Sequence, residues 1–207
     1  MIPSDNIFLI GLMGAGKTTI GRMLARHREM AFLDSDHEIE ARCGVSIPTI
    51  FEIEGEEGFR RREVCVIDEL SRRHGLVLGT GGGAVLNPLN RERLKARGVV
   101  VYLRCHPNEL YQRTRHDRNR PLLQTEDPLA RLQSLYEQRH PLYMQTADIV
   151  LDTGRQSVHC LVRKLEGVLE LSGEPAPGTP ASHVEEALDA SCADQSLDQI
   201  GERQPGP

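Results

Sequence analysis

The chain has 207 residues, of which 39% are hydrophobic and 27% are charged, so it is long enough for one globular domain with a sizeable core. No apolar run approaches the roughly 18 residues that a membrane span needs, and the first residues lack the pattern of a signal peptide, which together predict a cytoplasmic protein. The net charge of −5 argues against the basic surface of a nucleic-acid binder.

The first motif along the chain is GLMGAGKTT at residues 11–19, between an apolar run at residues 7–10 and a run with helical spacing. It matches G-x-x-x-x-G-K-[ST], the pattern of a strand-to-helix loop whose backbone N–H groups surround phosphates. In such a loop Lys17 reaches the terminal phosphates of a nucleotide, and the Thr18 hydroxyl ligates Mg²⁺. A glycine-rich turn with an incidental lysine is the alternative. The predicted ATP contacts in the motif are Gly14, Ala15, Gly16, Lys17, Thr18 and Thr19.

Two carboxylates follow the second predicted strand. Residues 31–33 are apolar, and Asp34 and Asp36 come at their C-terminal end, where ligands bind in parallel sheets. If both residues stayed extended, their side chains would point the same way, one toward a metal and the other toward a substrate hydroxyl. Capping of the next helix is the alternative for Asp36, whereas Asp34 is not needed as a cap.

A helical arm is predicted after these carboxylates. One helix ends at Gly44, and Ser46 begins another, which is interrupted at Gly55 and Gly58. The predicted core residues of this arm are Phe51, Ile53, Phe59, Val64, Ile67 and Leu70. The arginines at residues 60–62 either form the solvated face of the helix, which is the usual role of a charge run, or contact a substrate.

A second glycine-rich segment, GTGGG at residues 79–83, follows the third predicted strand at residues 76–78. Glycine costs about 0.5 to 1 kcal/mol in regular structure relative to alanine, so a run of glycines needs a reason. Close approach of the backbone to a ligand is one such reason. A tight turn is the alternative, although one glycine would suffice for it.

The remaining elements continue the alternation of strands and helices. Strands are predicted at residues 99–103 and 148–151, and helices at residues 88–97, 108–115, 128–145 and 158–171. Five strands that alternate with helices predict a three-layer α/β/α sandwich around a parallel sheet. The basic segment between residues 115 and 125 predicts a lid that brings Arg113, Arg118 or Arg120 over a nucleotide, with solvated loop charge as the alternative.

The composition changes at the end of the chain. A folded domain is predicted for residues 1–171, and residues 172–207 are predicted to be a disordered acidic tail, because their Pro, Gly and Ala content leaves little apolar surface to bury. The cysteines are widely scattered without a C-x-x-C pair, which predicts reduced thiols, most of them small core residues. They are Cys43, Cys65, Cys105, Cys160 and Cys192.

The sequence resembles the shikimate kinase family in six motifs, which occur in the family's order and spacing across residues 5–171. These motifs are GLMGAGKTTIGR, DSD, SIPTIFEIEGEEGFRRRE, GTGGG, NRPLL and RHPLY. The resemblance implies transfer of the ATP γ-phosphoryl group to the 3-hydroxyl of shikimate, a step toward chorismate and the aromatic amino acids. It also implies a five-stranded parallel sheet in the order 2-3-1-4-5, and Mg²⁺ bound by Thr18 with Asp34 in its outer shell. We expect a monomer that acts on ATP and shikimate and binds neither nucleic acid nor membranes.

The resemblance also implies roles for residues at the acceptor end of the site. Carried over by motif, Asp36 would bind the shikimate hydroxyls and act as, or near, the general base. Arg60 and Arg139 would hold the shikimate carboxylate, which suits the planar fork of a guanidinium. Backbone N–H groups of Gly82 and Gly83 would assist them.

At the donor end, the resemblance implies that Arg120 is the lid arginine on the phosphates. Together with Lys17 it would supply the positive charge that phosphoryl transfer requires. Arg113 and Gln156 would flank the adenine.

Other functions remain as alternatives. A gluconate kinase would share the loop and the lid, but it offers no reason for Arg60 and Arg139 together, or for the glycine run. A GTPase would need an N-K-x-D motif, which the sequence lacks. A catalytically silent nucleotide-binding protein would have no need of Lys17, Asp36 and Arg120.

Overall fold

The computed structural model describes residues 5–115, 123, 125–154 and 156–172, and all structural statements below concern these residues. The predicted lid arginines Arg118 and Arg120, and the predicted tail after residue 172, lie outside the described residues. No helix in the described part of the chain is long and apolar enough to cross a membrane.

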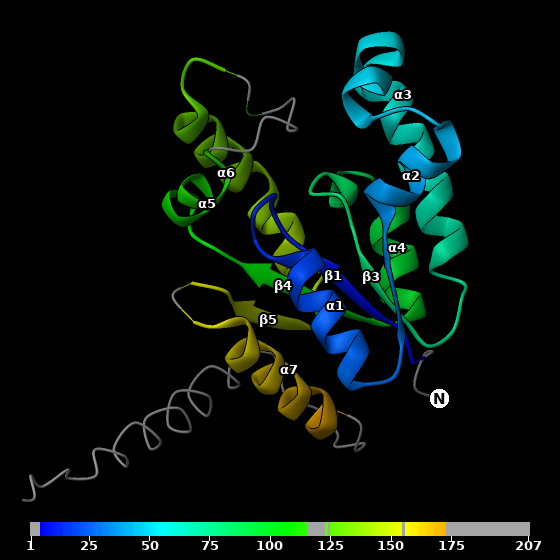
Figure 1. Ribbon diagram of the computed structural model, residues 1–207, viewed down its shortest axis with the longest axis vertical. Coiled ribbons are helices and arrows are strands. Elements are labelled where there is room, and N and C mark those ends of the chain that lie inside the picture. The colour runs from blue at the N-terminus through cyan, green and yellow to red at the C-terminus, as the bar shows by residue number, and fades with distance from the viewer. Residues whose placement is uncertain (1–4, 116–122, 124, 155, 173–207) are drawn as a thin grey trace, which may run out of the picture. The chain divides into compact units, whose positions relative to one another are not determined.

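Strands and helices alternate along the chain (Figure 1). The strands are β1 (Ile7–Ile10), β2 (Ala31–Asp34), β3 (Leu76–Gly79), β4 (Val99–Arg104) and β5 (Ile149–Asp152). The helices are α1 (Lys17–His27), α2 (Ser35–Cys43), α3 (Ile47–Leu70), α4 (Pro88–Arg97), α5 (Pro107–Thr114), α6 (Pro128–Thr146) and α7 (Val158–Ser172), with a 3₁₀ turn η1 (Ala84–Leu86) after β3. The predicted elements are therefore present, with bounds that differ by a few residues at most.

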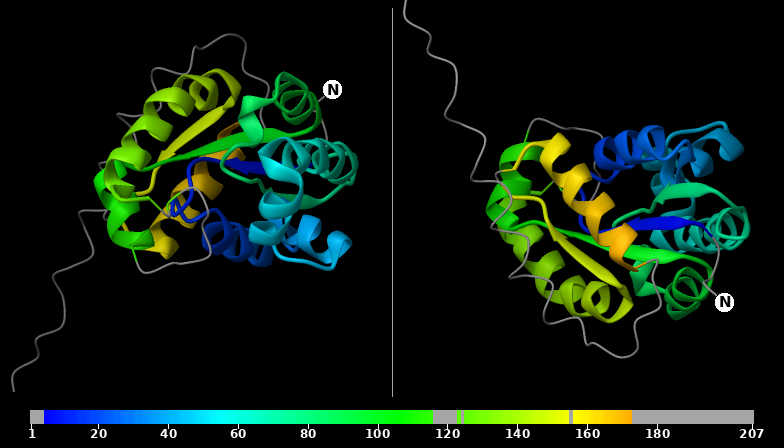
Figure 2. Two further views of the ribbon diagram at one scale, coloured as in Figure 1. Left: turned by 90° about the horizontal axis from the view of Figure 1, so that it is seen from above. Right: turned by 90° about the horizontal axis from the view of Figure 1, so that it is seen from below.

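The strands form one parallel sheet in the order β2-β3-β1-β4-β5, which confirms the predicted order. Helices α1 and α7 cover one face of the sheet, and α4 and α6 cover the other (Figure 2). Because β1 is covered on both sides, all four of its residues are buried, as a continuous apolar run predicts. The three-layer sandwich is confirmed.

The register of the sheet brings three functional segments to one edge. Gly79 at the end of β3 pairs with Leu9 of β1 on one side and with Asp34 of β2 on the other. Parallel strands place their carboxyl ends together, so the loop after β1, the carboxylates after β2 and the glycine run after β3 begin side by side.

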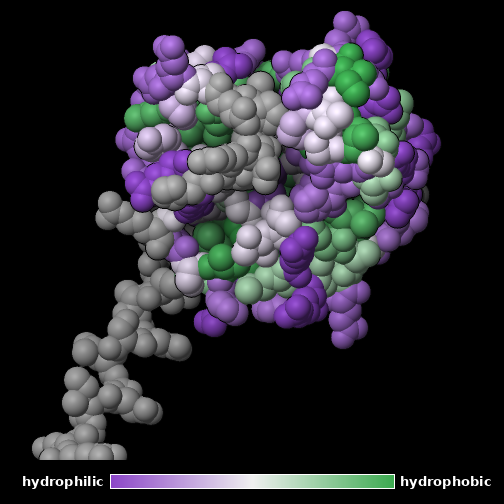
Figure 3. All heavy atoms as spheres, turned by 45° about the horizontal axis from the view of Figure 1, so that its top comes forward, coloured by the Kyte–Doolittle hydropathy of each residue, from purple (hydrophilic) through white to green (hydrophobic). Residues whose placement is uncertain are grey.

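The arm differs from the prediction in two respects. Helix α3 is broken once, at Gly55 with φ 69° and ψ −178°, whereas Gly58 continues the helix and is buried. Ile53 is 75% exposed rather than part of the core, because it follows Phe51 by two positions and so lies on another face of the helix. Hydrophobic side chains gather on the surface over α2 and α3 (Figure 3), where Val45 and Ile53 are exposed.

The described cysteines are free thiols, as predicted, but most of them are not core residues. Only Cys105 among them is buried, while Cys65 is exposed on the outer face of α3. Cys43 and Cys160 are half-buried, and Cys192 lies outside the described residues. Cysteine is small enough to be tolerated on a helix surface, so residue type alone did not predict its position.

Candidate active site

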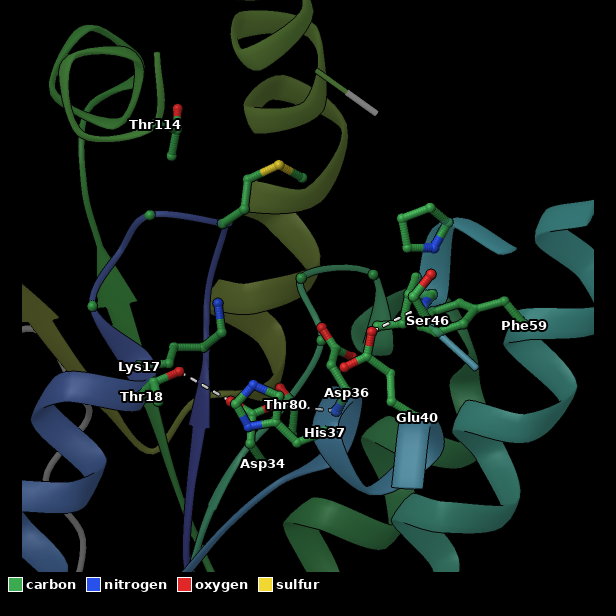
Figure 4. Close-up of a pocket in the computed structure, with 18 of the residues that line it drawn as sticks. Lys17, Thr18, Asp34, Asp36, His37, Glu40, Ser46, Phe59, Thr80 and Thr114 are labelled. Atoms are coloured by element: carbon green, nitrogen blue, oxygen red, sulfur yellow. Dashed lines mark hydrogen bonds between the residues drawn. The ribbon is translucent and has the colours of Figure 1, made fainter. Parts of the chain in front are cut away.

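A cavity of about 700 Å³ opens at the carboxyl edge of β1, β2 and β3 (Figure 4). Its walls come from the loop after β1, from α2, α3 and α6, and from the glycine run after β3. The predicted site residues that line it are Gly14, Gly16, Lys17, Thr18, Thr19, Asp34, Asp36, Arg60, Gly82, Gly83, Arg113 and Arg139. Residues from widely separated parts of the chain thus converge on one space.

The loop at residues 11–19 has the backbone of an anion cradle. Gly16 precedes α1 with φ 97°, a left-handed conformation that favours glycine, so the first N–H groups of α1 point into the cavity. The Lys17 ammonium group crosses the loop and donates to the carbonyl oxygens of Gly11 at 2.8 Å and of Leu12 at 2.9 Å. A positive charge and a helix N-terminus therefore face the same space.

Thr18 and Asp34 form a pair of oxygen ligands beside this loop. The Thr18 hydroxyl donates to Oδ2 of Asp34 at 3.0 Å, and Figure 4 shows the two side chains pointing toward each other at the N-terminal end of α1. No group of three or more His, Cys, Asp or Glu residues in the described part of the chain is able to hold a metal by itself. Mg²⁺ is usually held by one or two protein oxygens together with substrate phosphates, so this pair fits that ion.

The capping prediction for the two carboxylates was wrong. Helix α2 begins at Ser35, two residues earlier than a cap at Asp36 requires. Asp34 is its cap, since Oδ1 of Asp34 accepts from the Asp36 N–H at 3.0 Å. Asp36 lies in the first turn of the helix instead. The chain leaves the extended conformation between them, so the two side chains are not related as neighbours on one face of a strand.

Asp36 points into the cavity with one carboxylate oxygen unpaired. Its Oδ1 is buried and has no hydrogen-bond partner in the part of the chain that the structure describes. Burial raises the pKa of Asp36 to about 6, and the negative charge of Asp34 adds to this effect, while Lys17 and Arg60 oppose it. A buried acceptor without a donor is costly, so the site is built to receive a hydroxyl or a proton there.

Glu63 is a site residue that sequence reasoning missed. It is fully buried, and its Oε2 accepts from Arg60 Nη1 at 2.8 Å, while its Oε1 has no hydrogen-bond partner within residues 5–115, 123, 125–154 and 156–172. Burial raises the pKa of Glu63 to about 7, with Asp36 adding to the shift and Arg60 opposing it. The spacing of three residues from Arg60 was the available signal, but spacing does not reveal burial.

The three arginines of the charge run have different environments. Arg61 pairs with Glu57 and Arg62 pairs with Glu54, both on the outer surface, as a solvated face predicts. Arg60 instead turns toward the cavity, where Glu63 pairs with it. Although burial acts to lower the pKa of Arg60, the charge and hydrogen bonds of Glu63 raise it overall.

Arg139 reaches the cavity from α6 on the opposite side. Arg139 is only 3% exposed, and neither its Nε nor its Nη1 has a hydrogen-bond partner among the described residues. Burial lowers the pKa of Arg139, although the neighbouring Tyr143 opposes that decrease. Buried guanidinium groups are normally paired, so the free donors of Arg139 suit an anion. Arg60, which pairs with Glu56 and Glu63, lines the same cavity.

The three successive glycines leave room for these side chains. A methyl group on Gly81 would lie 2.6 Å from both Asp36 Oδ1 and Glu63 Oε1. One on Gly82 would lie 3.5 Å from the Met13 nitrogen and 3.7 Å from Arg139 Nη1, and one on Gly83 would overlap the Arg60 guanidinium. None of the three has a positive φ, so small size rather than conformational freedom explains Gly81 and Gly83, whereas a methyl group on Gly82 would make only ordinary contacts.

A second cavity, of about 340 Å³, lies beside the phosphate-binding loop. Ala15, Arg113 and Gln156 line it, so the structure brings together the two residues predicted to flank adenine. The Arg113 guanidinium donates to the carbonyl oxygens of Thr153 at 2.5 Å and Gly154 at 2.7 Å. It thereby holds the loop after β5 next to the loop after β1.

Comparison with known proteins identifies similar chains. The family model described as shikimate kinase matches residues 13–170. A shikimate kinase of Thiobacillus denitrificans is 60% identical over 182 residues, which cover 87% of this chain and 100% of that protein. A shikimate kinase of Ralstonia nicotianae is 58% identical over 183 residues, covering 87% and 96%. The solved structure of shikimate kinase from Acinetobacter baumannii in complex with shikimate has a TM-score of 0.80 and 49% identity, covering 85% of this chain and 97% of that one.

Proposed function

This chain belongs to the shikimate kinase family, and we propose that it transfers the γ-phosphoryl group of ATP to the 3-hydroxyl of shikimate. One observation carries the proposal. Two guanidinium groups, Arg60 from α3 and Arg139 from α6, converge on the cavity that also holds Asp36 and the phosphate-binding loop. This arrangement suits a small acceptor with a carboxylate at one end and hydroxyl groups at the other.

The acceptor binds by its carboxylate in this proposal. Arg60 and Arg139 each offer a planar fork of N–H donors, and two forks from different helices fix both the position and the orientation of a small ring. The Gly82 and Gly83 N–H groups add donors from the loop between them. The bound acceptor then presents a hydroxyl to Asp36.

Asp36 acts as the general base. Its unpaired Oδ1 accepts the proton of the 3-hydroxyl as that oxygen attacks the γ-phosphorus, and the bond from phosphorus to the bridging oxygen of ADP breaks. A carboxylate whose pKa is raised toward the working pH is a better proton acceptor than an ordinary one. The products are shikimate 3-phosphate and ADP.

The donor is held by the loop at residues 11–19. The backbone N–H groups and the Lys17 ammonium group bind the phosphates, and Thr18 and Asp34 hold Mg²⁺. When bound, Mg²⁺ neutralises charge on the phosphate oxygens. The second cavity supports an adenine position beside Arg113 and Gln156. These groups all come from one copy of the chain, so the predicted monomer would suffice for the reaction.

Arg120 completes the donor half in the proposal. It lies outside the described residues, and its role as a lid arginine on the transferring group stays a prediction.

An ADP-release assay on the purified protein tests the function. Shikimate, gluconate and nucleoside monophosphates are compared as acceptors at equal concentrations with Mg²⁺ and ATP. We expect ADP release that depends on shikimate, with little release for the other acceptors, because only shikimate joins a carboxylate to a rigid ring of hydroxyl groups. Turnover with gluconate and not with shikimate would support the alternative function instead.

A further inference from the structure

Tyr143 connects the helix that carries Arg139 to the glycine run. It follows Arg139 by four positions on α6, so the two side chains lie on the same face of that helix. Tyr143 is completely buried, and its hydroxyl donates to the carbonyl oxygen of Gly82 at 2.5 Å. Nothing in the proposed reaction uses this phenol.

The ring of Tyr143 is held in place by an aromatic column. It stacks on Tyr102 of β4, with ring centroids 4.8 Å apart and planes inclined by 24°. The Tyr102 hydroxyl lies 3.2 Å from Nδ1 of His140, and the His140 ring stacks on Tyr136 with centroids 4.8 Å apart. Because the ring is packed on both the sheet and the helix, the position of the Tyr143 hydroxyl is fixed.

A fixed hydroxyl fixes the peptide that it binds. The carbonyl of Gly82 and the N–H of Gly83 belong to one peptide, which is trans like the other described peptides, so they point in opposite directions. With its carbonyl held by Tyr143, this peptide directs the Gly83 N–H away from the Tyr143 hydroxyl. Neither the Gly82 nor the Gly83 N–H donates a hydrogen bond to any described residue. A peptide between two glycines would otherwise rotate easily.

Tyr143 also borders the other anion-binding group. It lies one helical turn after Arg139 on α6, so the phenol and the guanidinium share one face of that helix. A methyl group on Gly82 would lie 3.7 Å from Arg139 Nη1, so the guanidinium and the Gly82 peptide are themselves neighbours. The Tyr143 hydroxyl therefore binds a peptide that itself borders the arginine at this end of the cavity.

Resting on the proposed function, we propose that Tyr143 is a positioning residue for the carboxylate end of the acceptor. It holds the Gly82–Gly83 peptide, which borders Arg139, and so fixes the direction of the Gly83 N–H. It takes no part in phosphate binding, because its contacts lie on α6, β4 and the glycine run.

Tyr143→Phe tests this role, with Tyr102→Phe as the matched control. Both changes remove one hydrogen-bonded phenol hydroxyl from the same pair of stacked, buried rings, but only the first leaves the Gly82 carbonyl without its donor. The KM values for shikimate and for ATP are measured for both variants and for the wild type by ADP release. We expect Tyr143→Phe to raise the KM for shikimate about tenfold, because one buried hydrogen bond that orders the binding site is lost. The KM for ATP should stay unchanged. Tyr102→Phe should keep both values close to those of the wild type.

Thermal shifts give a second measurement that does not depend on turnover. Shikimate should raise the Tm of Tyr143→Phe less than that of Tyr102→Phe, while ADP with Mg²⁺ should raise both equally. Equal shikimate KM values in the two variants, or parallel changes in the KM for shikimate and ATP, would overturn the positioning role. A wild-type protein without shikimate-dependent turnover would overturn the proposed function and this role with it, whereas an active wild type isolates the role of Tyr143.

Discussion

Gly81→Ala is expected to disturb catalysis by crowding alone. The added methyl group would lie 2.6 Å from the carboxylate oxygens of Asp36 and Glu63, about 0.8 Å short of an ordinary contact. Gly81 itself has little freedom to withdraw, because its N–H donates to Ser35 Oγ at 2.9 Å and its carbonyl accepts from the Ala84 N–H at 3.1 Å. The two carboxylates must therefore move.

The size of the effect follows from that displacement. Misplacing a catalytic group by about 1 Å costs on the order of 100-fold in rate, so we expect kcat to fall by about that factor. Overpacking of a tight interior costs about 1–3 kcal/mol, so the free energy of unfolding should fall by a similar amount. The two effects have one cause, and both should appear in the same variant.

Gly167→Ala is the control for this experiment. Gly167 lies within α7, and a methyl group there would meet no atom within 4 Å. The change should leave kcat intact and should stabilise the helix by about 0.5–1 kcal/mol. ADP release at saturating substrates gives kcat, and denaturant unfolding gives the stability. A Gly81→Ala protein with the kcat and stability of the wild type would show that the carboxylates have room to move and that their position is not critical.

Three further predictions concern other parts of the chain. Asp36→Asn should lower kcat about 10²- to 10⁴-fold, because it removes the general base, and should leave the Kd for ATP unchanged. Turnover of this variant at the wild-type rate would exclude the catalytic role of Asp36. Arg60→Ala should raise the KM for shikimate about 10- to 100-fold, because it removes charge-assisted hydrogen bonds to the acceptor. Arg61→Ala, the surface control, should leave this KM unchanged. Equal effects of Arg60→Ala on the KM values for ATP and shikimate would show that Arg60 does not bind the acceptor. Deletion of residues 173–207 should preserve kcat and Tm, because the family match ends at residue 170, and an inactive or insoluble product would show that this segment belongs to the domain.

Much of the fold follows from local patterns in the sequence. The apolar run at residues 7–10 and the glycine–lysine–threonine pattern after it are contiguous, so the strand, the loop and the helix were predictable together. The ends of β2 and β3 were predictable for the same reason, since each strand stops at a change from apolar to polar or glycine residues. The prediction that Ile53 is a core residue was wrong, because an apolar residue two positions after Phe51 lies on a different face of the helix.

The parts of the site that were missed depend on contacts between distant segments. Glu63 looks like one acid among several in a charged helix, and only the fold buries it between Arg60 and Gly81. Tyr143 looks like an ordinary core aromatic until α6 is placed against the glycine run. Capping by Asp34 was missed because the sequence does not reveal the residue at which the backbone turns from strand to helix.

The division of the cavity among elements bears on how the specificity of such an enzyme can evolve. In the proposed site, the phosphate-binding loop is one continuous segment, residues 11–19, whereas the cationic groups for the acceptor come from α3 and α6. Under that proposal, substitutions at Arg60 or Arg139 would change which acceptor fits and would leave the phosphate-binding loop intact. A lineage is therefore free to exchange one small acceptor for another by altering two helices, without rebuilding its means of holding ATP.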